Sequence, residues 1–236
     1  MIVTVLLTIR ILESLAIPTP KPLLRLFLGD IINSHLATFY HYEPLLHYDI
    51  KQARSEPLAA DAVRVLTDLM HCNYTNLESY LEYGRHHHWL FQHNEILHGR
   101  RLQKMKTSFC WKPDFLNKFC LLFPFQSIKT VRLRLNLTRQ FIKDQSLNVR
   151  VLLLVRDPRG TIQSQKHRTW CSGNPDCEDP KLLCQDLVDD YRSFQVLKRE
   201  FPDRYMTFRY EDFSRNPVQN TQKVLFNFFD PLCILQ

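Results

Sequence analysis

The residues best suited to chemistry stand where an apolar run of the chain stops. Residues 149–155 are rich in Val and Leu, and the run ends at Arg156-Asp157-Pro158-Arg159-Gly160. Such a run indicates a parallel strand buried on both faces, and Pro158 suits the first turn of a helix. Ligands bind at the carboxyl ends of strands in parallel sheets. Arg156 and Ser164 are therefore candidates to hold one phosphate, through a charge-assisted and a hydroxyl contact. The alternative is a solvated strand-to-helix turn.

Other elements must surround this strand to position Arg156 and Ser164. Strand-like segments, rich in β-branched, apolar or aromatic residues, lie at residues 2–9, 38–42, 127–133 and 205–210. Helix-like segments lie at residues 57–69, 135–142, 183–197 and 217–228. Strands that alternate with helices favour an α/β domain with a parallel sheet.

Composition limits the possible partners. The chain has 236 residues, 44% of them hydrophobic, which suits one α/β domain. The formal charge of +7 favours anionic partners. No RNA-recognition or zinc-finger pattern occurs, which argues against nucleic acid, and the absence of GxxxxGK[ST] argues against a nucleotide kinase.

Cysteines and sequons bear on the compartment. None of the seven cysteines forms a CxxC pair of the kind that zinc sites use. Cys171, Cys177 and Cys184 could supply a loop disulfide, and the odd count leaves at least one thiol. The sequons at Asn73 and Asn136 would be glycosylated only in a secretory lumen. Together these features are compatible with an oxidising compartment.

The segment Leu154-Val155-Arg156-Asp157-Pro158-Arg159-Gly160, followed by Ser164, resembles the 3′-phosphate-binding segment of the Golgi carbohydrate 6-O-sulfotransferases. The resemblance runs from Leu28 to about Phe229. It implies that Arg156 and Ser164 hold the 3′-phosphate of the donor 3′-phosphoadenosine 5′-phosphosulfate (PAPS).

Further segments carry the same resemblance. Thr38 to Pro44 is similar to an aromatic strand that ends in Glu-Pro beside the acceptor sugar, so Glu43 is the candidate general base; the alternative is a structural Glu that ends the strand. His41 and His47 are lesser candidates for the same task.

Two basic motifs also match the family. Lys129-Thr130-Val131-Arg132 resembles an element that precedes the 3′-phosphate strand in this family. Its basic side chains contact the cofactor or an anionic glycan, or they are ordinary surface charges. Arg209-Tyr210-Glu211-Asp212-Phe213 is close to a family signature, for which we favour a structural pairing of Arg209 with Glu211.

The chain departs from the family after Arg10. There the family has Arg-x-Gly-Ser-Ser-Phe, whose backbone N–H groups wrap the 5′-phosphosulfate. Residues 11–27 replace this loop with a segment that has three prolines and no glycine. Arg10 is then a remnant of the 5′ site, and Lys21 is a weak substitute because a point charge does not replace oriented amides.

The histidines at residues 86–88 and at His93 raise the question of a metal. No carboxylate or cysteine accompanies them at ligand spacing. We therefore expect solvated surface or an acceptor-facing loop, and the resemblance requires no metal.

The resemblance implies a P-loop-NTPase-like parallel sheet flanked by helices, as a single partial domain over residues 1–236 that is incomplete at both ends. It implies PAPS-dependent transfer of sulfate to the 6-hydroxyl of galactose, N-acetylgalactosamine or N-acetylglucosamine in glycans such as keratan or chondroitin sulfate. The expected partners are a glycan acceptor and, through an anchor not present in this chain, the Golgi membrane. The alternative is an inactive sulfotransferase-like fragment that only binds nucleotide or glycan.

Overall fold

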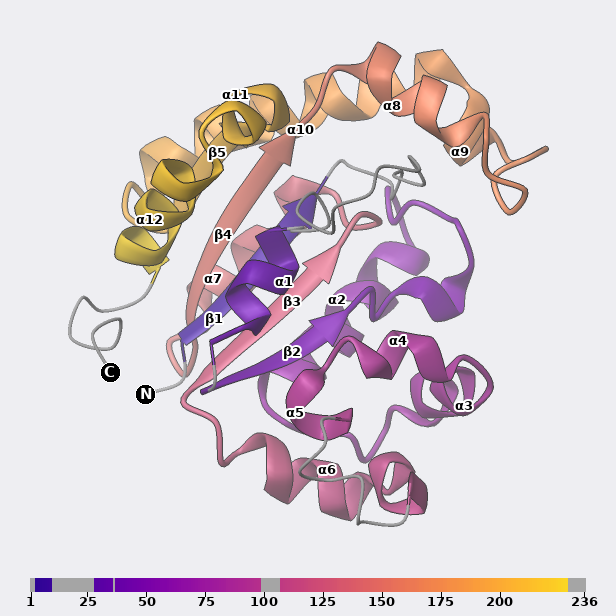
Figure 1. Cartoon of the computed structure of the whole chain (residues 1–236), viewed down its shortest axis with the longest axis vertical. Coiled ribbons are helices and arrows are strands. Elements are labelled where there is room, and N and C mark those ends of the chain that lie inside the picture. Colours follow the sequence, from indigo (N-terminus) through magenta and orange to yellow (C-terminus); the bar gives the residue numbers. More distant parts are fainter. Residues whose placement is uncertain (1–2, 10–27, 36, 99–106, 229–236) are drawn as a thin grey trace.

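A single parallel sheet forms the centre of the molecule (Figure 1). The computed structural model describes residues 3–9, 28–35, 37–98 and 107–228. Five strands run in the order β2-β3-β1-β4-β5, and every neighbouring pair is parallel. The strands are β1 Val3–Ile9, β2 Thr38–Tyr42, β3 Phe125–Thr130, β4 Asn148–Val155 and β5 Tyr205–Arg209. The predicted α/β parallel sheet is confirmed.

Helices join the strands and flank the sheet. They are α1 Leu28–Asn33, α2 Leu58–Met70, α3 Glu78–His86, α4 His88–Gln92, α5 Glu95–His98, α6 Pro113–Cys120, α7 Arg139–Lys143, α8 Pro158–Gln165, α9 Pro175–Glu178, α10 Pro180–Glu200, α11 Tyr210–Arg215 and α12 Pro217–Phe228. Short 3₁₀ turns lie at Leu46–Tyr48, Thr107–Trp111 and Leu135–Thr138. Within this part of the chain, no helix combines the length and apolarity needed to cross a membrane.

Strand β4 packs against helices on both of its faces. Val149, Val151 and Leu153 belong to one buried cluster, whereas Leu152 and Leu154 belong to another. Successive side chains of a strand point to opposite faces, so the two clusters occupy the two sides of the sheet. Burial on both sides explains why this strand is a continuous apolar run.

The two buried clusters assign helices to the two faces. Ile32 of α1, Phe213 of α11 and Val224 of α12 pack in the smaller cluster. Residues of α2, α7 and α10 pack in the larger one. Figure 1 shows α1 in front of the strands and α7 behind them. The sheet is therefore a covered layer, and only its strand ends are left to build a site.

Helix α10 buries acidic as well as apolar side chains. Leu197 is buried, but Tyr191 is exposed, and Asp186 and Asp190 are buried instead. In α12, likewise, Val218 is exposed while Val224 is buried. The helix predicted at residues 183–197 is confirmed, and its buried carboxylates pair with arginines from other elements, as described below.

Two disulfides close loops of very different length. Cys72 pairs with Cys120, and Cys171 pairs with Cys177. The second bridge is a loop disulfide of the kind expected from the cysteine spacing. Cys110 and Cys184 are free thiols.

Candidate active site

The turn from β4 to α8 is held by two carboxylates. The Asp157 side chain caps α8 and accepts a hydrogen bond from the Arg159 N–H at 2.9 Å. The Glu211 carboxylate accepts one from the Asp157 N–H, also at 2.9 Å. Arg209 lies near Asp212, with 3.9 Å between Nε and Oδ2, and not near Glu211 as the sequence predicts. Glu211 therefore has a structural role, but the turn that it stabilises is the one between β4 and α8 and not the turn between β5 and α11.

Arg156 follows β4 directly and is half-buried. Its guanidinium carbon lies 4.9 Å from the centre of the Tyr210 ring, a cation–π contact. The guanidinium also lies against Gly160, since a Cβ built there would stand 3.5 Å from Nε. Among the described residues Arg156 forms no ion pair, so its charge is available to a ligand.

Ser164 lies on α8 four residues after Gly160, which corresponds to roughly 6 Å along the helix. Its Oγ is buried and has no hydrogen-bond partner in the described part of the chain. A buried hydroxyl without a partner is costly, and a bound phosphate oxygen would satisfy it. Ser164 thus stays, with Arg156, a candidate to hold a phosphate, as the sequence predicts.

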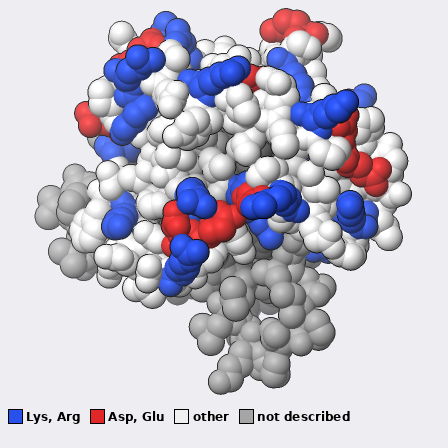
Figure 2. Space-filling view, turned by 90° about the horizontal axis from the view of Figure 1, so that it is seen from above, with Lys and Arg blue, Asp and Glu red and all other residues white. Residues whose placement is uncertain are grey.

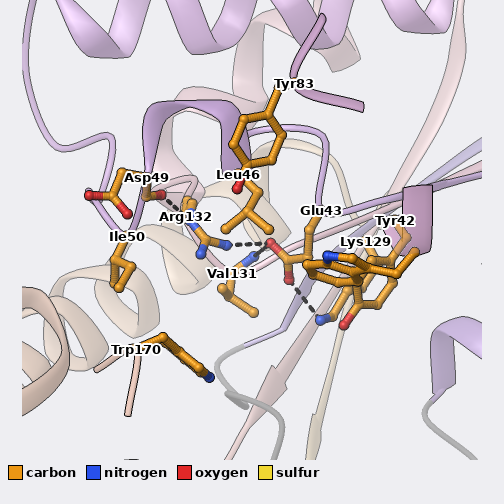
Figure 3. Close-up of a pocket in the computed structure, with 11 residues that line it drawn as sticks. Tyr42, Glu43, Leu46, Asp49, Ile50, Tyr83, Lys129, Val131, Arg132 and Trp170 are labelled. Atoms are coloured by element: carbon orange, nitrogen blue, oxygen red, sulfur yellow. Dashed lines mark hydrogen bonds and ion pairs between the residues drawn. The ribbon is translucent and has the colours of Figure 1, made fainter. Parts of the chain in front are cut away.

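A larger pocket of about 300 Å³ lies at the ends of β2 and β3. Figure 3 shows Glu43 and Arg132 at its centre, with Tyr83 and Trp170 on opposite sides of them. Neither Arg156 nor Ser164 lines this pocket; a much smaller one, about 10 Å³, borders Arg156. Arg156 and the 300 Å³ pocket therefore lie at the ends of different strands, since β3 and β2 are two and three strands away from β4.

Glu43 is the central charged group of the 300 Å³ pocket. Its carboxylate lies 2.7 Å from Lys129 Nζ through one oxygen and 2.7 Å from Arg132 Nη1 through the other. The residue adopts a positive φ of 45°, which is uncommon without glycine. Its N–H donates to the Lys129 carbonyl at 2.8 Å, which holds the strand end in that conformation.

Lys129 and Arg132 are buried, with 2% and 4% of their surface exposed. The alternative that they are only surface charges is therefore wrong. Lys129 also lies over the Tyr42 ring at 4.5 Å, and Arg132 Nε donates to the Asp49 carbonyl at 2.8 Å. Glu43 Oε2 also accepts from the Val131 N–H at 3.4 Å, whereas Oε1, next to Lys129, keeps a lone pair. The arrangement can accept a proton from a hydroxyl in the pocket.

The histidines have other positions. His41 is buried, and burial lowers its pKa to about 4. Burial also lowers the pKa of His47, whose Nδ1 lies 2.8 Å from the Pro44 carbonyl oxygen. Neither lines the pocket beside Glu43. In the described residues, no group of three or more His, Cys, Asp or Glu side chains is arranged to hold a metal.

An ion network between α10 and other segments of the chain has no signal in the sequence. Arg54 pairs with Asp176 at 2.5 Å and with Asp186 at 2.9 Å. Arg134 pairs with Asp186 at 3.1 Å and with Asp190 at 3.4 Å. The partners of Arg54 are more than 120 residues away in sequence, so no local spacing could reveal them.

Comparisons with known proteins agree with this architecture. The family described as "Sulfotransferase domain" matches residues 80–230. Carbohydrate sulfotransferase 1 of Danio rerio is 27% identical over 245 residues, which cover 84% of this chain and 58% of that protein. Carbohydrate sulfotransferase 1 of Homo sapiens is 26% identical over 84% of this chain and 59% of its own length. Carbohydrate sulfotransferase 4 of Mus musculus is 26% identical over 84% of this chain and 60% of its own.

The match defines the class of protein. This chain belongs to the sulfotransferase domain family, and its helix-flanked parallel sheet is the fold expected for that family. It spans about three fifths of the length of the curated relatives described above. Arg10 and residues 11–27, which the sequence places at the 5′ end of the donor site, lie outside the described residues.

Proposed function

We propose that this protein transfers a sulfuryl group from PAPS to the 6-hydroxyl of galactose, N-acetylgalactosamine or N-acetylglucosamine in a glycan. The observation that carries the proposal is the pair at the end of β4. The Arg156 guanidinium lies against Gly160 without an ion pair, and the Ser164 hydroxyl one turn later is buried without a partner in the described part. These two groups would hold the donor's 3′-phosphate.

The face around the strand ends supports an anionic donor. Figure 2 shows the molecule from above, the side toward which β4 points, with Lys and Arg side chains spread over it and fewer carboxylates between them. The two disulfides support a secretory compartment, for which we propose the Golgi lumen.

The chemistry divides between the two sites. The donor supplies the activated sulfuryl group: its S–O bond to the 5′-phosphate breaks while a new S–O bond to the sugar oxygen forms. Glu43 takes the hydroxyl proton as general base, and Lys129 and Arg132 hold the carboxylate in place. Arg156 and Ser164 contribute positioning, which dominates the related phosphoryl transfers.

A second candidate is a noncatalytic relative that binds nucleotide or glycan without transfer. The specific feature in its favour is the segment 11–27, which lacks the glycine and serines of the family loop. A loop of oriented N–H groups is what would stabilise the charge that develops on the leaving phosphate.

One assay decides between the two candidates. Purified protein is incubated with ³⁵S-labelled PAPS and desulfated keratan or chondroitin, and label in the glycan is counted. Transfer above a heat-inactivated control supports the enzyme. Saturable binding of adenosine 3′,5′-bisphosphate without transfer would refute it and establish the binding protein.

A further inference from the structure

The 300 Å³ pocket beside Glu43 has aromatic walls. Tyr42, Tyr83, Trp89 and Trp170 all line it. Trp89 and Trp170 remain 45% and 43% exposed, although both are large indoles. One exposed aromatic needs no explanation, but two at one pocket leave apolar surface that a ligand would cover.

Trp89 is held from the β2 side of the pocket. It lies on α4, with its ring centre 6.2 Å from that of Tyr42 at 69° and 6.5 Å from that of His93. Tyr42 in turn stacks on His93, with ring centres 3.8 Å apart. The exposed indole therefore rests on a fixed aromatic base.

Trp170 is held by the loop that follows α8. The next residue, Cys171, is fully buried and bonded to Cys177. Ile50, which lines the pocket, packs against both cysteines. Asp176 of the short helix α9, inside the same disulfide-closed segment, accepts hydrogen bonds from the Gln52 N–H at 2.8 Å and from Arg54 at 2.5 Å.

The charges of the pocket balance. Glu43 is matched by Lys129 and Arg132. Asp49 is exposed, and its carboxylate forms no ion pair with the described residues, so it can accept hydrogen bonds from a ligand. With two acidic and two basic side chains, the pocket does not favour a charged ligand.

We infer that Trp89 and Trp170 form a clamp for one uncharged hexopyranose ring, with Asp49 as an acceptor for its hydroxyl groups. A pyranose carries an apolar C–H face that packs on an aromatic ring, and hydroxyls at its rim that donate to carboxylates. The inference rests on the proposed function, because this ring is the acceptor sugar. It makes the loop at residues 170–177 a determinant of acceptor affinity.

Glycan binding is tested by calorimetric titration of the full chain with a desulfated keratan oligosaccharide. Trp170→Ala and Trp89→Ala should each weaken binding by roughly tenfold or more, as expected for a central aromatic anchor. Tyr191→Ala, which removes an exposed aromatic from α10 outside the pocket, should leave the affinity unchanged. Because the ring is uncharged, the affinity should be nearly independent of salt.

A parallel titration with adenosine 3′,5′-bisphosphate separates this inference from the proposed function. The bisphosphate should bind all four proteins alike. Equal glycan affinity in wild type and Trp170→Ala, or binding that weakens steeply with salt, would overturn the clamp while leaving the donor site intact. Failure of the wild type to bind the bisphosphate would instead refute the proposed function, whatever the glycan titration shows.

Discussion

The Glu43 carboxylate, which is proposed to act as the general base, also pairs with two buried basic side chains, Lys129 and Arg132. Each carboxylate oxygen is 2.7 Å from a cationic nitrogen, and 5% of the residue is exposed. Removing one member of a buried charge cluster leaves the others without compensation. The effect of Glu43 on stability and its proposed role as general base therefore have different physical causes, which can be measured separately.

Glu43→Gln should lower the sulfate-transfer rate by about 10²-fold or more, because an amide cannot take the hydroxyl proton. It should also lower the free energy of unfolding by about 3 kcal/mol, because Lys129 and Arg132 lose their counter-charge. The measurements are transfer of ³⁵S and urea unfolding. Glu82→Gln, which breaks an exposed pair with Arg85, is the matched control and should change neither. Full transfer activity in a destabilised Glu43→Gln protein would reduce Glu43 to a structural role.

His41 should make the fold sensitive to acid. Burial lowers its pKa to about 4, below the value of roughly 6.5 expected in the unfolded chain. Between these values the unfolded state binds more protons, so stability falls as the pH drops. This group alone should cost about 2 kcal/mol between pH 7.5 and pH 5.

His41→Phe, which keeps an aromatic ring between Phe39 and Tyr74, isolates the contribution of the histidine. Urea unfolding at the two pH values should show a smaller loss in the variant than in wild type. An identical loss in both proteins would mean that His41 does not carry this pH dependence.

At the scale of secondary-structure elements, α10 is linked through its carboxylates to two arginines that come much earlier in the chain, Arg54 and Arg134. Asp186 and Asp190 pair with Arg134, and Asp186 also pairs with Arg54. Asp190 additionally accepts a hydrogen bond from the Leu135 N–H at 2.9 Å. These contacts fix α10 against the segment that follows β3.

Asp190→Ala should therefore destabilise the protein by about 2 to 3 kcal/mol, because the Leu135 N–H loses its buried acceptor and Arg134 keeps only Asp186 as a counter-charge. The neighbouring Asp189 is exposed and pairs only weakly with Arg192, at 3.7 Å. Asp189→Ala should change the free energy of unfolding by less than about 0.5 kcal/mol. Equal unfolding midpoints in urea for the two variants would contradict the assigned network.

Removing each of the two disulfides should affect stability and glycan binding to different extents. Cys72–Cys120 closes a loop of 48 residues and Cys171–Cys177 a loop of 6, so removing the longer one should cost more stability, about 4 against about 2 kcal/mol in the loop-entropy estimate. The order should reverse for oligosaccharide affinity, because only the Cys171–Cys177 loop carries Trp170. Paired Cys→Ser variants are compared by urea unfolding and by titration. Loss of glycan affinity only in the Cys72/Cys120 pair would contradict the proposed role of the loop.

The sequence predicted elements better than it predicted their contacts. A buried parallel strand and a proline at the start of a helix are local patterns, and both appear in the structure, as does the strand before Glu43 that the family resemblance predicts. The pairing of Arg54 with Asp186 spans 132 residues, and the positions of Trp89 and Trp170 at one pocket depend on loop paths. Local periodicity contains no information about either.

At the scale of the whole molecule, strand order sets the distance between the two sites. Glu43 follows β2 and Arg156 follows β4, with β3 and β1 between them. Three strand spacings correspond to roughly 14 Å, which leaves room for a nucleotide between a 3′-phosphate at Arg156 and a sugar at Glu43. The central strand β1, which ends at Ile9, lies between the two sites.

The account depends most on whether the groups at the end of β4 hold a 3′-phosphate. Calorimetric titration of adenosine 3′,5′-bisphosphate and of adenosine 5′-monophosphate measures this directly, with Arg159→Ala as the control, because the Arg159 side chain is 90% exposed on the same turn. We predict that wild type and Arg159→Ala prefer the bisphosphate by at least about tenfold, and that Arg156→Ala and Ser164→Ala lose most of that preference. Equal affinity of the wild type for the two nucleotides, or an undiminished preference in Arg156→Ala, would contradict the account.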